Sequence, residues 1–428
     1  MSDTTRLIRT DTAPIGERDI HTFVKKALDG ICRPVRKALI IPPDFTRSHS
    51  YGGKLTAVYY ELLKERCEVT IMPALGTHVP LTETEIEAFF GPQIPKDCFA
   101  VHHWRRDIER IGEVPGAFVE EATGGLFDEP IAIEINKLLL DPSFDLIVSI
   151  GQVVPHVVAG MANYSKNILV GCGGRDIINR SHFIGAVYGM ERLMGRADNP
   201  VRKIFDYAQE HFLNRLSIQY VLTVTNVTTD GVDLEGVFAG TGRDVFEEAA
   251  RYSVEKNIFL LDKPIRHVVA YLDEEEFKST WLGNKAIYRT RMAIADGGRL
   301  TILAPGVKTF GEDSENDRLI RKYGYVERET VMKALDDEDI RNNLAAAAHL
   351  IHGATEGRFT VEYAVTHLSR EEVEGVNYTY APYAEAVRKY NPDTLNEGYN
   401  TVDGEEIYFV KKPALGLWAC REIFEANA

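Results

Sequence analysis

Short apolar runs alternate with longer amphipathic stretches through the first half of the chain. Apolar runs that end at glycine, proline or a polar cluster predict buried strands at residues 37–44, 68–78, 144–151 and 217–227. After the first of these runs, residues 53–66 place four apolar side chains on one face of a helix. Strands that alternate with helices favour a mainly parallel sheet, because parallel strands need a crossover connection.

A second unit is predicted to begin near residue 262. Its first four segments have the pattern of strand, polar loop, helix and strand, at residues 266–272, 273–284, 285–298 and 299–306. This order is again typical of a parallel sheet. The predicted fold is therefore α/β with two domains, each a mainly parallel sheet flanked by helices, covering residues 1–262 and 263–428.

Composition narrows the class of protein and of partner. Hydrophobic residues make up 44% of the 428 residues, which is enough for large cores, and the net charge of −15 disfavours nucleic acid or an anionic membrane as a general partner. No stretch approaches the roughly 20 apolar residues of a membrane span, and the N-terminus has no apolar signal core. Five scattered cysteines without a CxxC spacing fit a reducing cytoplasm.

Candidate catalytic residues follow the predicted strands of the first domain. Ligand sites of open α/β sheets form where loops leave the carboxyl ends of strands. After the first strand, Asp44, Thr46 and Arg47 offer a carboxylate, a hydroxyl and a forked cation suited to carboxylate or phosphate. A helix cap with a surface ion pair explains the same residues equally well.

Histidines and a lysine occupy the next two loops. His78 follows the second strand, and the segment after the third strand holds His156 and Lys166, with His182 beyond it. A histidine can bind metal or transfer protons near neutral pH, and a lysine among apolar neighbours can lose its proton and act as a nucleophile. A structural histidine and a snorkelling surface lysine are the alternatives, and the spacing alone decides neither.

The order of these motifs resembles the nickel-pincer lactate racemase family. "DxTR" at 44–47 is followed by "GTH" at 76–78 and "HxxAG" at 156–160, then by a lysine ten residues after His156 and a histidine sixteen residues after Lys166. The later text "AIYRTRMAIADGGRLTILAPGVKTFGE" is similar to the C-terminal domain of the family. The resemblance extends roughly from Ala38 to Phe310.

The resemblance implies a covalently held cofactor, the nickel-pincer nucleotide. This nicotinic-acid-derived mononucleotide carries nickel in a sulfur–carbon–sulfur pincer, and in the family a lysine at position 166 holds it through a thioamide link. His182 would supply the fourth nickel ligand. The segment with Asp44, Thr46 and Arg47 would line the cofactor. Separate maturation enzymes would be needed to load it.

The same resemblance implies the reaction. His78 and His156 would be acid and base on opposite faces of a 2-hydroxy acid, and C2 would be inverted by loss and return of its hydrogen as hydride. The active site would lie in the cleft between the two domains. The expected substrate contacts are Arg47, Tyr288, Arg289, Arg291 and Arg358.

The chain departs from the family pattern mainly at substrate contacts. Ser165 replaces the arginine that precedes the family lysine, and Met292 stands at the position of a family lysine. Arg358 or Phe359 falls where the family has a tryptophan. The additional arginines suggest a substrate larger or more polar than lactate, such as a sugar acid or a dicarboxylate.

Three alternatives remain open from the sequence. A Schiff-base lyase or aldolase would use Lys166 on a carbonyl substrate. A divalent-metal hydrolase would use His78, His156 and His182 without a nucleotide. A non-catalytic carrier or sensor would bind a hydroxy acid and leave its C2 hydrogen in place.

Overall fold

A computed structural model describes residues 4–10, 13–228 and 231–427, and every predicted site residue lies within these ranges. The chain divides into two compact units: the first runs up to Ser181 and includes Gly195–Asn257, and the second comprises His182–Met194 and Ile258–Ala428. The sequence placed the boundary a few residues later and did not predict that the segment with His182 joins the second unit. The functional role expected of each domain stays a prediction.

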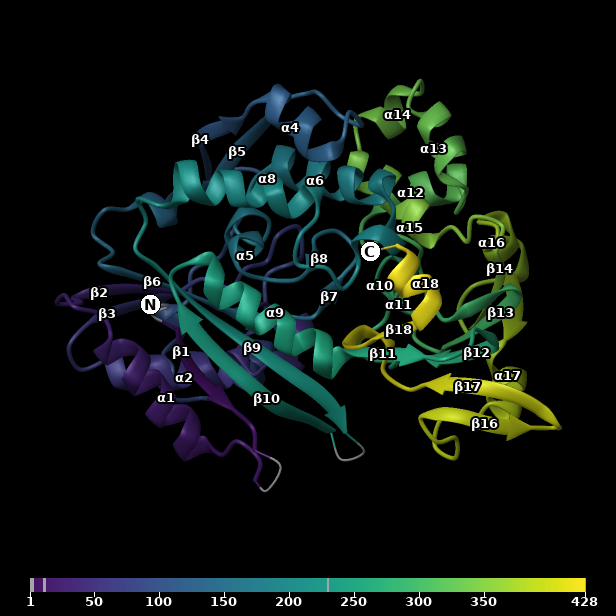
Figure 1. Cartoon of the computed structure of the whole chain (residues 1–428), viewed down its shortest axis with the longest axis horizontal. Coiled ribbons are helices and arrows are strands. Elements are labelled where there is room, and N and C mark those ends of the chain that lie inside the picture. The colour runs from purple at the N-terminus through teal and green to yellow at the C-terminus, as the bar shows by residue number, and fades with distance from the viewer. Residues whose placement is uncertain (1–3, 11–12, 229–230, 428) are drawn as a thin grey trace. The chain divides into compact units, whose positions relative to one another are not determined.

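The first unit is built on a six-stranded sheet with the order β1-β10-β9-β6-β2-β3 (Figure 1). The strands are β1 (Thr5–Ile8), β2 (Lys37–Ile41), β3 (Glu68–Ile71), β6 (Leu146–Gln152), β9 (Ile218–Thr228) and β10 (Gly231–Gly240). The four strands from β9 to β3 are parallel, and β10 pairs antiparallel with both β9 and β1. The carboxyl ends of β2, β3 and β6 therefore lie at one edge of this sheet.

Both faces of this sheet are covered, which explains the unbroken apolar run of β2. Ala38 and Ile40 pack with residues of α1 and α2, and the alternating Leu39 and Ile41 are also fully buried. The helices of this unit include α1 (Glu17–Asp29), α2 (Gly52–Leu63), α3 (Glu83–Phe90), α4 (Gly116–Thr123), α5 (Ser165–Leu169), α8 (Pro200–Ala208) and α9 (Arg243–Asn257). Two small antiparallel pairs are β4 (Ile108–Val114) with β5 (Ile131–Asn136), and β7 (Pro155–His156) with β8 (Gly160–Met161).

Short helical segments and one long helix complete the first unit. The 3-10 segments are η1 (Phe45–Ser50), η2 (Lys96–Cys98) and η3 (Lys137–Leu140), and η4 (Gln209–Leu213) is a π-helical segment. The helix α6 (Arg175–Tyr188) begins in the first unit and ends in the second. No helix in the described ranges is long and apolar enough to span a bilayer.

The second unit has its own six-stranded sheet, ordered β15-β14-β13-β12-β17-β16. Its strands are β12 (Ile265–Tyr271), β13 (Ile294–Ala304), β14 (Phe359–Val365), β15 (Thr379–Pro382), β16 (Gly398–Val402) and β17 (Glu405–Val410). All neighbours are parallel except β16 and β17. A separate parallel pair joins β11 (Ile258–Leu261) to β18 (Leu417–Cys420). The predicted α/β class with two mainly parallel sheets is confirmed.

Short helices surround the second sheet. They are α7 (Met190–Leu193), α10 (Thr280–Gly283), α11 (Lys285–Thr290), α12 (Ser314–Tyr323), α13 (Arg328–Ala334), α14 (Glu338–Arg341), α15 (Leu344–Gly353), α16 (Arg370–Gly375), α17 (Tyr383–Lys389) and α18 (Arg421–Ala426), with the 3-10 turn η5 (Pro413–Leu415).

The predicted helix at 285–298 is wrong in its second half. The helix α11 ends at Thr290 and β13 begins at Ile294. The carbonyl of Met292 accepts the backbone N–H of Cys420 at 2.8 Å, and Ile294 pairs with Ile265 of β12. Pairing with neighbouring strands therefore overrides the helical spacing of the sequence, as tertiary context commonly does.

Candidate active site

The loops that leave β2 and β3 run side by side at the carboxyl edge of the first sheet. The N–H of Ala74 donates to the carbonyl of Pro42 at 2.8 Å, which continues the parallel pairing beyond the strands. The turn at Gly76 has a φ of 57°, a conformation that glycine adopts without strain, and its N–H donates to the carbonyl of Gly171 at 2.8 Å. These contacts bring Asp44 and His78 together from two different loops.

Asp44 and His78 are joined by a hydrogen bond. The Nδ1 of His78 meets one carboxylate oxygen of Asp44, and the hydroxyl of Thr46 donates to the other at 2.6 Å. Burial favours the neutral acid, but His78, Arg47 and Thr46 outweigh it and hold the pKa of Asp44 well below its usual range. The carboxylate thus fixes a proton on Nδ1 and leaves Nε2 of His78 as the nitrogen for proton exchange.

Lys166 lies on α5, which is fastened to the same edge of the sheet. The side-chain amide of the next residue, Asn167, donates to the hydroxyl of Ser149 at 3.0 Å and to the carbonyl of Ile41 at 3.4 Å. Burial, reinforced by Arg47 and Arg202 and opposed by Asp44, lowers the pKa of Lys166 to about 7. A large share of this amine is therefore uncharged and nucleophilic at neutral pH.

His156 lies in the short β7–β8 hairpin that leads toward Lys166. Its Nδ1 accepts the backbone N–H of Val158 at 3.0 Å, so in the neutral ring the proton is on Nε2. The N–H of Ala162 donates to the carbonyl of Val154 at 2.9 Å and closes the hairpin. The side chain is half-buried. Its partnership with His78 across a substrate stays a prediction.

The remaining predicted site residues belong to the second unit: His182, Tyr288, Arg289, Arg291 and Arg358. His182 lies on α6 and influences the buried His352, which in turn has its ring centroid 6.2 Å from that of Tyr288. Burial, followed by His349, His182 and Arg291, lowers the pKa of His352. The nickel-ligand role of His182, and the placement of a site between the domains, stay predictions.

The three arginines predicted to contact substrate have partners within the second unit. Arg291 is 1% exposed, forms an ion pair with Glu191 and donates to the carbonyl of Ala354 at 3.0 Å. The buried Arg289 donates to the carbonyl of Gly416 at 3.2 Å. Arg358 pairs with Asp296 at 2.8 Å and also donates to the carbonyls of Arg291 and Ile294. Substrate binding by these groups stays a prediction.

Comparison with known proteins finds similarity to one family. The lactate racemase N-terminal domain matches residues 14–192. Lactate racemase of Thermoanaerobacterium thermosaccharolyticum is 26% identical over 292 residues, which cover 65% of this chain and 62% of that relative, less than two thirds of its length. The chain is thus similar to lactate racemase, most clearly in its N-terminal part.

Solved structures share the fold of this chain. A crystal structure of a protein from Thermotoga maritima superposes with a TM-score of 0.81 at 24% identity, covering 95% of this chain and 99% of that chain. The lactate racemase apoprotein from Thermoanaerobacterium thermosaccharolyticum gives a TM-score of 0.68 at 20% identity, covering 95% of this chain and 93% of that one. At these identities the likeness establishes the fold.

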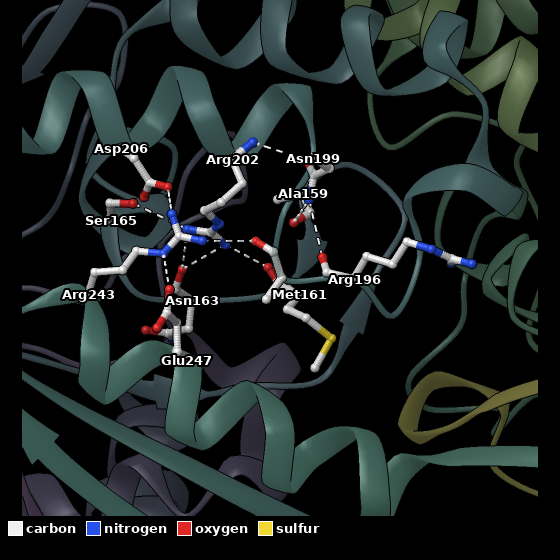
Figure 2. Close-up of polar contacts among 11 residues, drawn as sticks. Ala159, Met161, Asn163, Ser165, Arg196, Asn199, Arg202, Asp206, Arg243 and Glu247 are labelled. Atoms are coloured by element: carbon white, nitrogen blue, oxygen red, sulfur yellow. Dashed lines mark hydrogen bonds and ion pairs between the residues drawn. The ribbon is translucent and has the colours of Figure 1, made fainter. Parts of the chain in front are cut away.

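Sequence reasoning missed Arg202, the third helical residue of α8. Its side chain is completely buried and contacts the segment that precedes Lys166 (Figure 2). The sequence feature that could have revealed it is an arginine on the apolar face of the helix "PVRKIFDYA", next to Val201 and near Phe205. An arginine in such a position must bring its own hydrogen-bond partners into the core.

Two further features bear on the choice of site. A cavity of about 1250 Å³ in the first unit is lined by Leu146 and Ile218, which lie at the amino ends of β6 and β9. It is thus at the opposite edge of the sheet from Lys166. Among the described residues, no three His, Cys, Asp or Glu side chains are grouped to hold a metal ion.

Proposed function

We propose that the chain is a racemase or epimerase that inverts C2 of a 2-hydroxy acid. The observation that carries the proposal is the near-neutral pKa of Lys166, placed at the sheet edge that also holds the Asp44–His78 pair. A free amine beside a proton-transfer pair is the minimum that a lysine-tethered cofactor and an acid–base step require.

The residues fit a nickel-pincer nucleotide held covalently at Lys166. An uncharged amine can form an amide-type bond, whereas a fully protonated surface lysine reacts slowly at neutral pH. His182 would be the one protein ligand to nickel, and imidazole suits that metal. When bound, this group would supply a site that takes hydrogen from C2 as hydride and returns it. Its assembly on the chain would require maturation enzymes.

The chain's own residues would bind the substrate and move its protons. The Nε2 of His78 would take the hydroxyl proton, and the Asp44 carboxylate would stabilise the resulting imidazolium. His156 is proposed as the acid–base group on the other face, since inversion needs one on each side, and the proton on its Nε2 is the one that it can donate. Arg47, whose side chain donates to the Thr46 hydroxyl at 3.2 Å, would hold the substrate carboxylate.

The substrate is proposed to be a 2-hydroxy acid more polar than lactate. Four guanidinium groups are proposed as substrate contacts: those of Arg47, Arg289, Arg291 and Arg358. The charge of Arg291 is already balanced by Glu191, so it counts less toward a second carboxylate. A panel of lactate, dicarboxylates and sugar acids would overturn this part if lactate were turned over best. The small-molecule substrate, a reducing cytoplasmic setting and the absence of nucleic-acid or membrane partners complete the proposal.

The deciding experiment is intact-protein mass spectrometry after co-expression with the maturation enzymes. We expect an adduct of nucleotide size on the Lys166 peptide, and loss of both adduct and C2 inversion in Lys166→Ala. Lys166→Arg keeps the charge without a nucleophilic amine and is the matched control, with the same expected loss. A chain of unmodified mass that still inverts C2 would refute the tether.

A second function rests on the same observation. A neutral buried amine is also what a Schiff-base lyase needs. Borohydride would trap a carbonyl substrate on Lys166 if that alternative holds, in the absence of any metal. A non-catalytic binding protein would instead leave the configuration at C2 of a bound hydroxy acid unchanged. Mass spectrometry distinguishes the nucleotide adduct from the borohydride-trapped adduct, and chiral chromatography of the hydroxy acid identifies the binding protein.

A further inference from the structure

Arg202 is buried against the segment that carries Lys166. Its guanidinium makes four hydrogen bonds: to the carbonyl of Met161 at 2.7 Å, twice to the carbonyl of Asn163 at 3.3 and 3.4 Å, and to the hydroxyl of Ser165 at 3.2 Å. Figure 2 shows these groups converging on it from the loop before α5. Its position is fixed in turn by α8, where its N–H donates to the side chain of Asn199.

The segment that Arg202 holds has an unusual backbone. Asn163 and Tyr164 have φ values of 67° and 59°, so two consecutive non-glycine residues are in a region that L-residues rarely adopt. The side chain of Asn163 also lies so close to Gly151 that a Cβ there would be 1.9 Å from its amide nitrogen. Such a turn persists only when its surroundings over-determine it, and strained turns of this kind cluster at functional sites.

Arg202 differs from its neighbour Arg243 in having no carboxylate partner among the described residues. Both guanidiniums lie near the ring of Phe246, at 4.2 and 5.8 Å from its centroid. Arg243 pairs with Asp206, whereas no carboxylate in the described part of the chain forms an ion pair with Arg202. In the described residues, the hydrogen-bond acceptors of the Arg202 guanidinium are all in the 161–165 turn. Burial, then Arg243, lowers the pKa of Arg202. Its charge is thus available to act on Lys166.

We propose that Arg202 is a positioning residue for Lys166. Its planar fork holds the 161–165 turn in the left-handed conformation and so sets the direction in which the Lys166 side chain leaves α5. Its charge, together with that of Arg47, also favours the uncharged amine. The chain has Ser165 beside the lysine, and the guanidinium reaches that position from a different helix. The functional importance of positioning Lys166 rests on the proposed cofactor tether. The positioning of Lys166 by Arg202 does not depend on that tether.

Hydrogen–deuterium exchange of the apoprotein tests the turn directly. In the wild-type protein we expect amides 163–167 to exchange as slowly as the core strand β6, and fast exchange there would overturn the proposal without any variant. Arg202→Lys keeps the charge but loses the fork. We expect at least about tenfold faster exchange at 163–167 in this variant, because charge-assisted buried hydrogen bonds are among the stronger ones. Arg243→Lys is the matched control and should exchange as the wild type does in this segment.

The pH dependence of Lys166 acylation tests the charge. An amine-specific acylating reagent and mass spectrometry of the Lys166 peptide give the midpoint of labelling, expected near pH 7 in the wild type. Arg202→Met should raise this midpoint, Arg202→Lys should leave it nearly unchanged, and Arg243→Lys should not move it. An Arg202 variant counts as folded when its amides in β6 exchange as in the wild type. If such a variant also keeps wild-type exchange at 163–167, the proposal is refuted. Absence of an adduct after co-expression would refute the tether but would not affect the exchange and acylation results for Arg202.

Discussion

The cations of the two units differ in how they are balanced. Around Lys166 in the first unit, burial is the main cause that lowers the pKa of the amine, the guanidiniums of Arg47 and Arg202 lower it further, and Asp44 opposes them. In the second unit, Arg291 and Arg358 each have a carboxylate partner, Glu191 and Asp296. An excess of positive charge perturbs a lysine and prepares it to react, whereas a paired arginine mainly supports structure. The first unit is therefore where the chain's own chemistry is concentrated.

The largest expected effect is on the reactivity of Lys166. Its neutral fraction rises as pH increases through about 7, whereas an ordinary lysine reaches that point near 10.5. At pH 7 it should be acylated about a thousand times faster than exposed lysines, before steric effects, because the two protonation equilibria differ by more than three pH units. Competitive labelling across pH 5–10, with the exposed Lys25 as internal reference, measures this ratio. A Lys166 midpoint equal to that of Lys25 would remove the contrast between the units.

The same shift predicts how stability depends on pH. The folded pKa of Lys166 is lowered, so between about pH 7 and 10 the unfolded chain binds one more proton at this residue than the folded chain does. Stability should therefore rise with pH in that window through this group. Lys166→Met should flatten the rise, measured as the difference in urea unfolding free energy between pH 7 and pH 9.5.

The next effect in size concerns Arg291. Arg291→Met leaves the half-buried carboxylate of Glu191 without its cation, so the loss should be at or below the lower end of the about 3–5 kcal/mol that breaking a fully buried pair costs. Thermal or urea unfolding of the second unit should show this loss. The double variant Glu191→Gln with Arg291→Met should recover a large part of it, since no unpaired charge remains. If Arg291→Met instead leaves stability intact, its ion pair with Glu191 does not support the structure and the contrast between the units is wrong.

How much of this was predictable from sequence depends on the type of signal. Alternating apolar runs predicted both parallel sheets, because burial on both faces leaves a clear pattern, as in β2. The motif at Asp44 and the turn at Gly76 were visible because they directly follow strands. Arg202 and Glu191 were not, because their partners lie far away in sequence or belong to the backbone. A guanidinium that is hydrogen-bonded to three oxygens of a turn produces no periodic pattern in the sequence.

The end of α11 shows the same limit for local structure. Residues 285–298 have helical spacing, yet the backbone leaves the helix after Thr290 to pair with β18 and β12. Similarly, nothing in the sequence indicated that Arg291 would meet Glu191, one hundred residues earlier in the chain. Contacts of this kind require the assembled fold.

A smaller effect, confined to the first unit, is expected for Asp44→Asn. An amide cannot stabilise the imidazolium of His78 and can hold the ring in the wrong tautomer, as general acid–base arguments require. We expect kcat to fall by about 10²-fold, the lower end of what such catalysis contributes, with little change in KM. Steady-state kinetics of the loaded protein measure the split. Equal adduct content in the two proteins is the control that separates proton transfer from cofactor loading.

The smallest effect should come from Thr46, whose hydroxyl donates to Asp44 at 2.6 Å. Thr46→Val removes that hydrogen bond, so the pKa of Asp44 should rise from its lowered value while His78 and Arg47 still hold it below neutrality. The acid limb of kcat would then move to higher pH, and activity at pH 7 would fall only about two- to tenfold, in keeping with a net hydrogen-bond contribution of about 0.5–1.5 kcal/mol. Thr46→Ser keeps the hydroxyl and should retain the wild-type limb. An unmoved limb in Thr46→Val would mean that Asp44 does not control the protonation of His78, and their hydrogen bond would then be structural, as the ion pairs of the second unit are.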